Sequence, residues 1–223
     1  TFYYTKRTDL SYTVNYYEEG TESKLAESKV VNGQKYLATV TEEAIDIEGY
    51  NKVEPTSKTI TINVENNVIN FYYTKRTDLK YTVNYIEKGS NTYLAESKVV
   101  ENQTYLSSVT EDAITIKGYV AEEPTSKTIE IKVSGNEITF YYTKRADLSY
   151  TVNYYEEGTE NKLADSKVVN GQTYMSEVTE KAVDINGYVK EEPTEQTITI
   201  NVDGNVINFY YTKRTDLTYT VKY

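Results

Sequence analysis

The side chains that offer the most recognition chemistry in this sequence are tyrosines, with 25 Tyr against 4 Phe. Tyr72, Tyr141 and Tyr210 recur in strand-like segments, on the side opposite the apolar residues. Exposed phenol rings can stack on sugar rings and supply contact area at low entropic cost. These three tyrosines are therefore our candidate ligand-binding residues. The alternative is that they pack across the strand against neighbouring threonines and lysines.

Charged side chains offer two further kinds of site. The basic pair Lys75-Arg76 has copies at Lys144-Arg145 and Lys213-Arg214. It could bind acidic sugars, or it could form weak ion pairs with the acidic hairpin of the next unit. The acidic pairs Glu42-Glu43 and Glu122-Glu123 lack the Asp-x-Asp-x-Asp-Gly pattern of a calcium loop. We therefore expect a solvated acidic face, no metal site and no cofactor.

Composition argues against several classes of function. Because Asp and Glu outnumber Lys and Arg by 34 to 24, the net charge of -10 disfavours nucleic acid as a partner. No apolar run approaches the roughly 20 residues of a membrane span, so we expect no membrane contact by this segment. The chain has no cysteine and no histidine, which removes thiol catalysis and the commonest general base. We expect no catalytic residue and no enzyme activity.

An internal repeat organises the whole chain. Its three prolines, Pro55, Pro124 and Pro193, lie 69 residues apart. The phrase Phe-Tyr-Tyr-Thr-Lys-Arg recurs with the same spacing, and the chain begins within this pattern, as expected of an excerpt from a longer protein. The predicted units are the last strand of a preceding repeat at 1–10, three repeats at 11–79, 80–148 and 149–217, and the first strand of a following repeat at 218–223.

Within one repeat, residues 12–16, 25–31, 59–64 and 68–73 are predicted strands, and an Asn-Gly turn follows the second. Residues 39–47 predict a short helix, because Thr39 and Glu42 have capping-box spacing and apolar residues follow at helical intervals. The predicted fold class is α+β, with a mixed sheet and one short helix in each unit.

Alternation within the strands predicts which side chains pack on the helix. In the second repeat Tyr81, Val83 and Tyr85 should face the helix, and Thr82 and Asn84 should face water. One glycine recurs at the same place in each repeat, at Gly49, Gly118 and Gly187, and the tyrosine directly after it should fill the edge of the core. These tyrosines are Tyr50, Tyr119 and Tyr188.

The repeat resembles the MucBP (mucin-binding protein) repeat of Gram-positive cell-surface adhesins. The resemblance rests on the strand Tyr-Thr-Val-Asn-Tyr, the acidic-Gly hairpin, the Gly-Tyr pair and the closing Val-Ile-Asn-Phe-Tyr-Tyr. It implies a ubiquitin-like β-grasp fold, an extracellular, cell-surface location with wall anchoring outside these residues, and binding to host mucin or another glycoprotein or glycan. It brings no catalytic residues.

The topology of such a sheet predicts how the repeats connect. If the first and last strands are central, adjacent and parallel, the chain enters each unit at one end and leaves at the other. The five-residue joint at 75–79 would then place monomeric units head to tail in a rod roughly 100 Å long. Two functions remain open: adhesin repeats that bind a host glycoprotein, and a purely structural stalk that projects a separate head domain.

Overall fold

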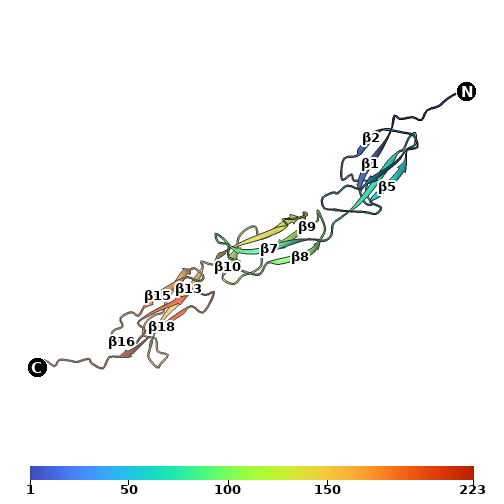
Figure 1. Cartoon of the computed structure of the whole chain (residues 1–223). Coiled ribbons are helices and arrows are strands. Elements are labelled where there is room, and N and C mark those ends of the chain that lie inside the picture. The colour runs from blue at the N-terminus through green and yellow to red at the C-terminus, as the bar shows by residue number, and fades with distance from the viewer. The chain divides into compact units, whose positions relative to one another are not determined.

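The computed structural model describes residues 1–223 and is built from eighteen β-strands, with no helix among its elements (Figure 1). It contains no helix that is long and apolar enough to cross a membrane. Two compact units divide the chain, and each is described by itself. The first comprises Thr1–Asn84, Ser97–Glu111 and Ser126–Ile138, and the second comprises Tyr85–Glu96, Asp112–Thr125 and Thr139–Tyr223.

Six strands recur in each of three repeated sets. The first set is β1 (Leu10–Glu18), β2 (Lys29–Gln34), β3 (Thr39–Glu43), β4 (Tyr50–Lys52), β5 (Ser57–Thr61) and β6 (Val68–Lys75). The second set is β7 (Leu79–Glu87), β8 (Lys98–Gln103), β9 (Ser108–Asp112), β10 (Tyr119–Ala121), β11 (Ser126–Glu130) and β12 (Glu137–Lys144). The third set is β13 (Leu148–Glu156), β14 (Lys167–Gln172), β15 (Glu177–Lys181), β16 (Tyr188–Lys190), β17 (Glu195–Thr199) and β18 (Val206–Lys213).

Each set forms a four-stranded mixed sheet and a two-stranded sheet. In the first set the orders are β2-β1-β6-β4 and β3-β5, and the other two sets repeat this arrangement. The central strands β1 and β6 are parallel, in a register that runs from Thr13↔Val68 to Glu18↔Tyr73. The outer strands β2 and β4 pair antiparallel with their neighbours. The expectation that the first and last strands are adjacent and parallel is therefore confirmed in this repeat.

The predicted helix is wrong, and with it the α+β class and the ubiquitin-like β-grasp fold. Residues 39–43 form strand β3, which pairs antiparallel with β5, Val40 opposite Ile60. The Thr41 and Thr59 hydroxyls lie 2.8 Å apart in a hydrogen bond across this pair. The β-branched run Thr-Val-Thr favours a strand, and its exposed and half-buried residues alternate with period two. The fold is all-β.

The second strand also differs from its prediction. It begins at Lys29 and continues through the Asn-Gly pair to Gln34, so that Gly33 lies inside a strand and not in a hairpin turn. Gly33 has a φ of 72°, and Asn102 has a φ of 58° at the same place in the next repeat. The register of β1 and β2 shifts between Leu10 and Tyr12, opposite this residue. The left-handed residue marks an irregularity in the pairing, where Gly or Asn is favoured.

The core lies on the predicted side of the sheet. In the second repeat Tyr81, Val83 and Tyr85 are buried, as the alternation predicted. Asn84, predicted to face water, is only 5% exposed, so that prediction is wrong. The Ser97 hydroxyl, from the loop before β8, donates a hydrogen bond of 2.6 Å to the Asn84 side-chain oxygen. This loop therefore lies against Asn84, and hydrogen bonding satisfies the buried amide.

Candidate functional site

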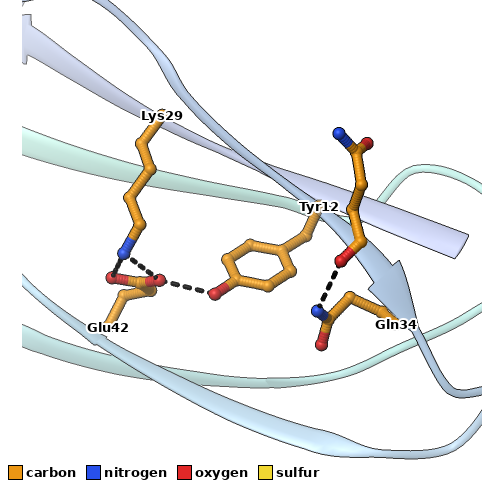
Figure 2. A network of polar contacts seen from close by, with 5 residues as sticks. Tyr12, Lys29, Gln34 and Glu42 are labelled. Atoms are coloured by element: carbon orange, nitrogen blue, oxygen red, sulfur yellow. Dashed lines mark hydrogen bonds and ion pairs between the residues drawn. The ribbon is translucent and has the colours of Figure 1, made fainter.

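A tyrosine, a glutamate and a lysine connect the two sheets of each repeat. In the first repeat the Tyr12 hydroxyl on β1 donates to Glu42 Oε1 on β3 at 2.6 Å. Lys29 Nζ on β2 donates to the two oxygens of the same carboxylate at 2.7 and 2.8 Å (Figure 2). The Glu42 side chain is 12% exposed. The same contacts recur among Tyr81, Glu111 and Lys98, and among Tyr150, Glu180 and Lys167.

These contacts fix the protonation of the groups. The hydrogen bond from Lys29, followed by that from Tyr12, lowers the pKa of Glu42 below its ordinary value. The hydrogen bond to Glu42, together with burial, raises the pKa of Tyr12 to about 12. At neutral pH the carboxylate is ionised and the phenol protonated. Because each group is engaged by its partners, the arrangement links the sheets and offers no group for acid–base chemistry.

The predicted ligand-binding tyrosines lie on the open face, where they are both accessible and packed. Tyr72 is 37% exposed, Tyr141 45% and Tyr210 40%. The Tyr72 ring centroid lies 6.2 Å from that of Tyr17, and the corresponding pair of Tyr210 and Tyr155 lies at 6.1 Å. Each of the three tyrosines belongs to a different strand set. Their role in ligand binding stays a prediction.

One shallow pocket lies beside Tyr72 and another beside Tyr210. A pocket of 510 Å³ beside Tyr72 is lined by Pro55, Lys58 and residues of β5 and β6. Lys58 Nζ lies 5.5 Å from the Tyr72 ring centroid and donates a 2.6 Å hydrogen bond to the Asn70 carbonyl. A pocket of 470 Å³ beside Tyr210 is lined by Tyr155, Thr159, Glu160, Lys162 and Tyr210. The middle repeat has Ile86 where the others have Tyr17 and Tyr155.

A second recurring arrangement lies at the joint between repeats. The Tyr50 and Tyr105 rings meet edge to face, with centroids 5.6 Å apart and an interplanar angle of 78°. A Cβ placed on Gly49 would lie 2.3 Å from the Tyr105 ring, so this ring packs directly on the glycine. Arg76 joins the two sides, because its N–H donates to the Gly49 carbonyl and its carbonyl accepts from the Tyr105 N–H, both at 2.9 Å. Tyr50, predicted to fill only the core edge, also contacts the next repeat.

The two basic residues at this joint, Lys75 and Arg76, form ion pairs with residues of their own repeat and of the connecting segment. The Arg76 guanidinium donates two hydrogen bonds, of 2.9 and 2.8 Å, to the Asp78 carboxylate two residues later. Lys75 Nζ lies 3.7 Å from a Glu18 oxygen of its own repeat. The predicted pairing of Lys75-Arg76 with the acidic hairpin of the next unit is therefore wrong. The arginine instead holds the short connection in a fixed conformation.

Asn67, between the predicted strands 59–64 and 68–73, makes contacts that the sequence did not predict. Asn67 is buried, and its amide donates to the carbonyls of Ser11 at 3.0 Å and Asn63 at 2.9 Å. Its side-chain oxygen accepts from the Asn63 N–H at 2.8 Å. The β5–β6 connection is thus attached to the start of β1. Asn136 and Asn205 make the corresponding contacts. The available signal was that this asparagine recurs while its neighbours vary.

Comparison with known proteins gives only weak likenesses. No family model matches the chain, and no curated protein matches it. Among solved structures, the Bacillus anthracis TIE protein is 14% identical and matches 93% of this chain, with a TM-score of 0.42. The chain spans about half of that protein, 51% of its length.

Two further solved structures are a repeat of a mucus binding protein and a pilin. The type 2 repeat of the mucus binding protein MUB from Lactobacillus reuteri is 14% identical, over 60% of this chain and 99% of that repeat, with a TM-score of 0.23. A streptococcal ancillary pilin is 12% identical, over 86% of this chain and 80% of the pilin, with a TM-score of 0.27. Likenesses at these identities and TM-scores carry no argument about function.

Proposed function

We propose that this chain is the repeat region of a bacterial cell-surface adhesin and that its repeats serve as a spacer that bears tension along the polypeptide. The observation that carries this proposal is the central parallel pair of first and last strands in the first and third repeats. The resemblance of the repeat to mucin-binding repeats supports the cell-surface location.

Parallel pairing determines how a repeat responds to a pull on its ends. The chain enters β1 at one end of the pair and leaves β6 at the other, so tension slides the two strands past each other. Sliding requires the slanted hydrogen bonds of the pair to break together, whereas peeling breaks them one after another. Hydrogen bonds at both ends complete the pair: Thr13 N–H donates to the Asn67 carbonyl and Glu19 N–H to the Tyr73 carbonyl, each at 2.9 Å.

The other two repeats have the corresponding backbone hydrogen bonds between their first and last strands. In the third repeat Thr151 N–H donates to the Asn205 carbonyl and Glu157 N–H to the Tyr211 carbonyl, both at 2.9 Å. In the second repeat the corresponding acceptors are the Asn136 and Tyr142 carbonyls. A load-bearing arrangement that recurs without change is expected where every repeat carries the same force in series.

Single-molecule pulling on the full chain tests this function, and the absence of native cysteine allows attachment at chosen positions. Handles at Thr8→Cys and Thr77→Cys load the first repeat in shear, because these exposed residues flank opposite ends of the pair. Handles at Glu22→Cys and Thr77→Cys load the same repeat so that β1 peels from β6. We expect a higher rupture force in the shear geometry. Equal forces, or a higher force in the peeling geometry, would refute the load-bearing role.

A second candidate function is binding of a host mucin, another glycoprotein or a glycan on the open face. The specific observation is a pocket lined by Tyr72 in the first repeat and a pocket lined by Tyr155 and Tyr210 in the third. An aromatic ring beside a lysine offers a stacking surface and a hydrogen-bond donor to a sugar ring. Tyr141 occupies the corresponding position in the middle repeat and belongs to the same proposed surface.

Immobilised mucin and a glycan array test this second candidate. The combined change Tyr72→Ala, Tyr141→Ala and Tyr210→Ala should abolish binding by the full chain, whereas Val189→Ala, at an exposed residue that lines neither pocket, should leave it unchanged. Equal loss in both variants would contradict the open-face site, and no binding by the parent chain would leave the spacer as the function.

A further inference from the structure

The two joints inside the chain share one set of contacts, which defines a docking interface. At the second joint the Tyr119 and Tyr174 rings meet edge to face at 5.7 Å, as Tyr50 and Tyr105 do at the first. A Cβ on Gly118 would lie 2.3 Å from the Tyr174 ring. We call Tyr105 and Tyr174 the joint tyrosines, and the glycine and tyrosine that receive each of them the Gly-Tyr pair.

The third repeat has a Gly-Tyr pair that receives no joint tyrosine. No atom lies within 4 Å of a Cβ placed on Gly187, in contrast to Gly49 and Gly118. A pocket of 520 Å³ adjoins it, and Ile185, Gly187, Tyr188, Lys190 and Arg214 are among its lining residues. The surface that the joint tyrosine covers at the other two joints is therefore open here.

The connection required for docking is already in place at this open surface. Arg214 N–H donates to the Gly187 carbonyl at 2.9 Å, as Arg145 does to Gly118. The Arg214 guanidinium donates two hydrogen bonds to Asp216, at 2.9 and 2.8 Å. Residues 215–221 have the same sequence as residues 77–83 except at one position. The segment that leads into a docked repeat at the first joint is therefore present after the third repeat as well.

We propose that the pocket at Gly187–Tyr188 is a docking site for a further copy of this repeat, which inserts its joint tyrosine there and is joined through residues 214–217. The occupant is an aromatic ring that meets Tyr188 edge to face and lies against the Cα of Gly187. Its backbone N–H binds the Arg214 carbonyl, as Tyr174 binds the Arg145 carbonyl at 2.8 Å. This interface extends beyond the spacer proposal and does not depend on it, because it concerns which surface accepts a neighbour.

Nuclear magnetic resonance of the glycine Hα signals tests the docking directly. In the existing chain, aromatic rings over Gly49 and Gly118 should shift their Hα signals upfield, and Gly187 should show no such shift. We then extend the chain by placing a copy of residues 80–148 after Leu217. The Gly187 signal should move to match Gly118, and it should move back when the joint tyrosine of the added copy becomes alanine.

The glycines also supply a matched thermodynamic test. Gly49, Gly118 and Gly187 have φ values of 80°, 83° and 80°, so alanine imposes the same backbone strain at each. Only at an occupied joint does the added methyl group also clash with a ring. Gly118→Ala should therefore destabilise the existing chain more than Gly187→Ala, and the two costs should become equal in the extended chain.

One result overturns the proposal: the added repeat folds while the Gly187 signal and the cost of Gly187→Ala stay unchanged. A second extension, a copy of residues 149–217 after Leu217, provides the same readouts if the first added copy does not fold. An upfield shift of Gly187 in the unextended chain would also contradict it, because the pocket would then be filled by another ring.

Discussion

Removing one hydroxyl from the connection between sheets should loosen a single repeat by a measurable amount. Tyr150→Phe in the third repeat deletes the donor that lies 2.6 Å from Glu180, while the hydrogen bond from Lys167 at 2.6 Å remains. A hydrogen bond to a charged group contributes about 1.5–3 kcal/mol. We therefore expect the free energy of opening this repeat to fall by that amount.

Amide hydrogen exchange in the full chain measures this change repeat by repeat. The slowest amides of β13 and β18 should exchange roughly ten- to a hundredfold faster in the variant. The amides of the first repeat should be unaffected and serve as an internal reference. Tyr155→Phe, which removes a hydroxyl from the same strand but on the open face, is the matched control and should change the rates little.

The pH dependence of the difference in amide exchange rate between the parent chain and Tyr150→Phe gives a second check. Because hydrogen bonds from Lys167 and Tyr150 lower the pKa of Glu180, its contribution is fully present above its ordinary value of about 4.3. The contribution is lost as pH falls through the lowered value, because the carboxyl then becomes neutral in both states. The exchange rates of parent and variant should converge in acid. A difference that is independent of pH, or no difference at neutral pH, would refute the reasoning.

Three further changes probe other parts of the structure. Burial raises the pKa of the Tyr73 and Tyr150 phenols to about 12, and the hydrogen bond to Glu42 raises that of Tyr12 to about 12. The stability that these groups contribute is present below pH about 10 and should be lost as pH rises through about 12. Tyrosinate absorbance and unfolding should therefore appear together in an alkaline titration. Phe209→Ala empties a fully buried ring position and should lower the stability of the third repeat by about 3–5 kcal/mol in denaturant titration, whereas exposed Val189→Ala should not. Asn205→Ala leaves the Ser149 carbonyl and the Asn201 backbone without their partner and should cost about 1–3 kcal/mol, and an unchanged midpoint would argue against its connecting role.

The sequence contained enough information to predict the repeat length and the apolar side chains of the core, because these depend on the fixed spacing and on local alternation. The central pair of strands followed only from the assumed sheet topology. The sequence did not determine whether residues 39–47 form a helix or a strand. Val40, Ala44 and Ile47 suit one side of a helix, but the Thr-Val-Thr run suits a strand equally. The choice depends on β5, which lies some twenty residues further along the chain and supplies the pairing partner.

The candidate sites also include some residues that the sequence could predict and others that it could not. The open-face tyrosines could be found by alternation, because their exposure depends on the strand that carries them. The joint tyrosines could not, since Tyr105 and Tyr174 acquire their role only from a glycine of the neighbouring repeat. Asn84 was misplaced for a related reason: a loop lies against it, and strand alternation says nothing about loops.

Each repeat has a Gly-Tyr pair that receives a neighbour and a joint tyrosine that inserts into one. This arrangement affects how the gene can change in length. An in-frame duplication or loss of one 69-residue period brings together two ends that already fit, whichever copies are involved. Recombination between near-identical copies can therefore lengthen or shorten the region without any compensating substitution. Breakpoints offset from the period would instead unite ends that lack a matching surface, so the joint chemistry favours change by whole repeats.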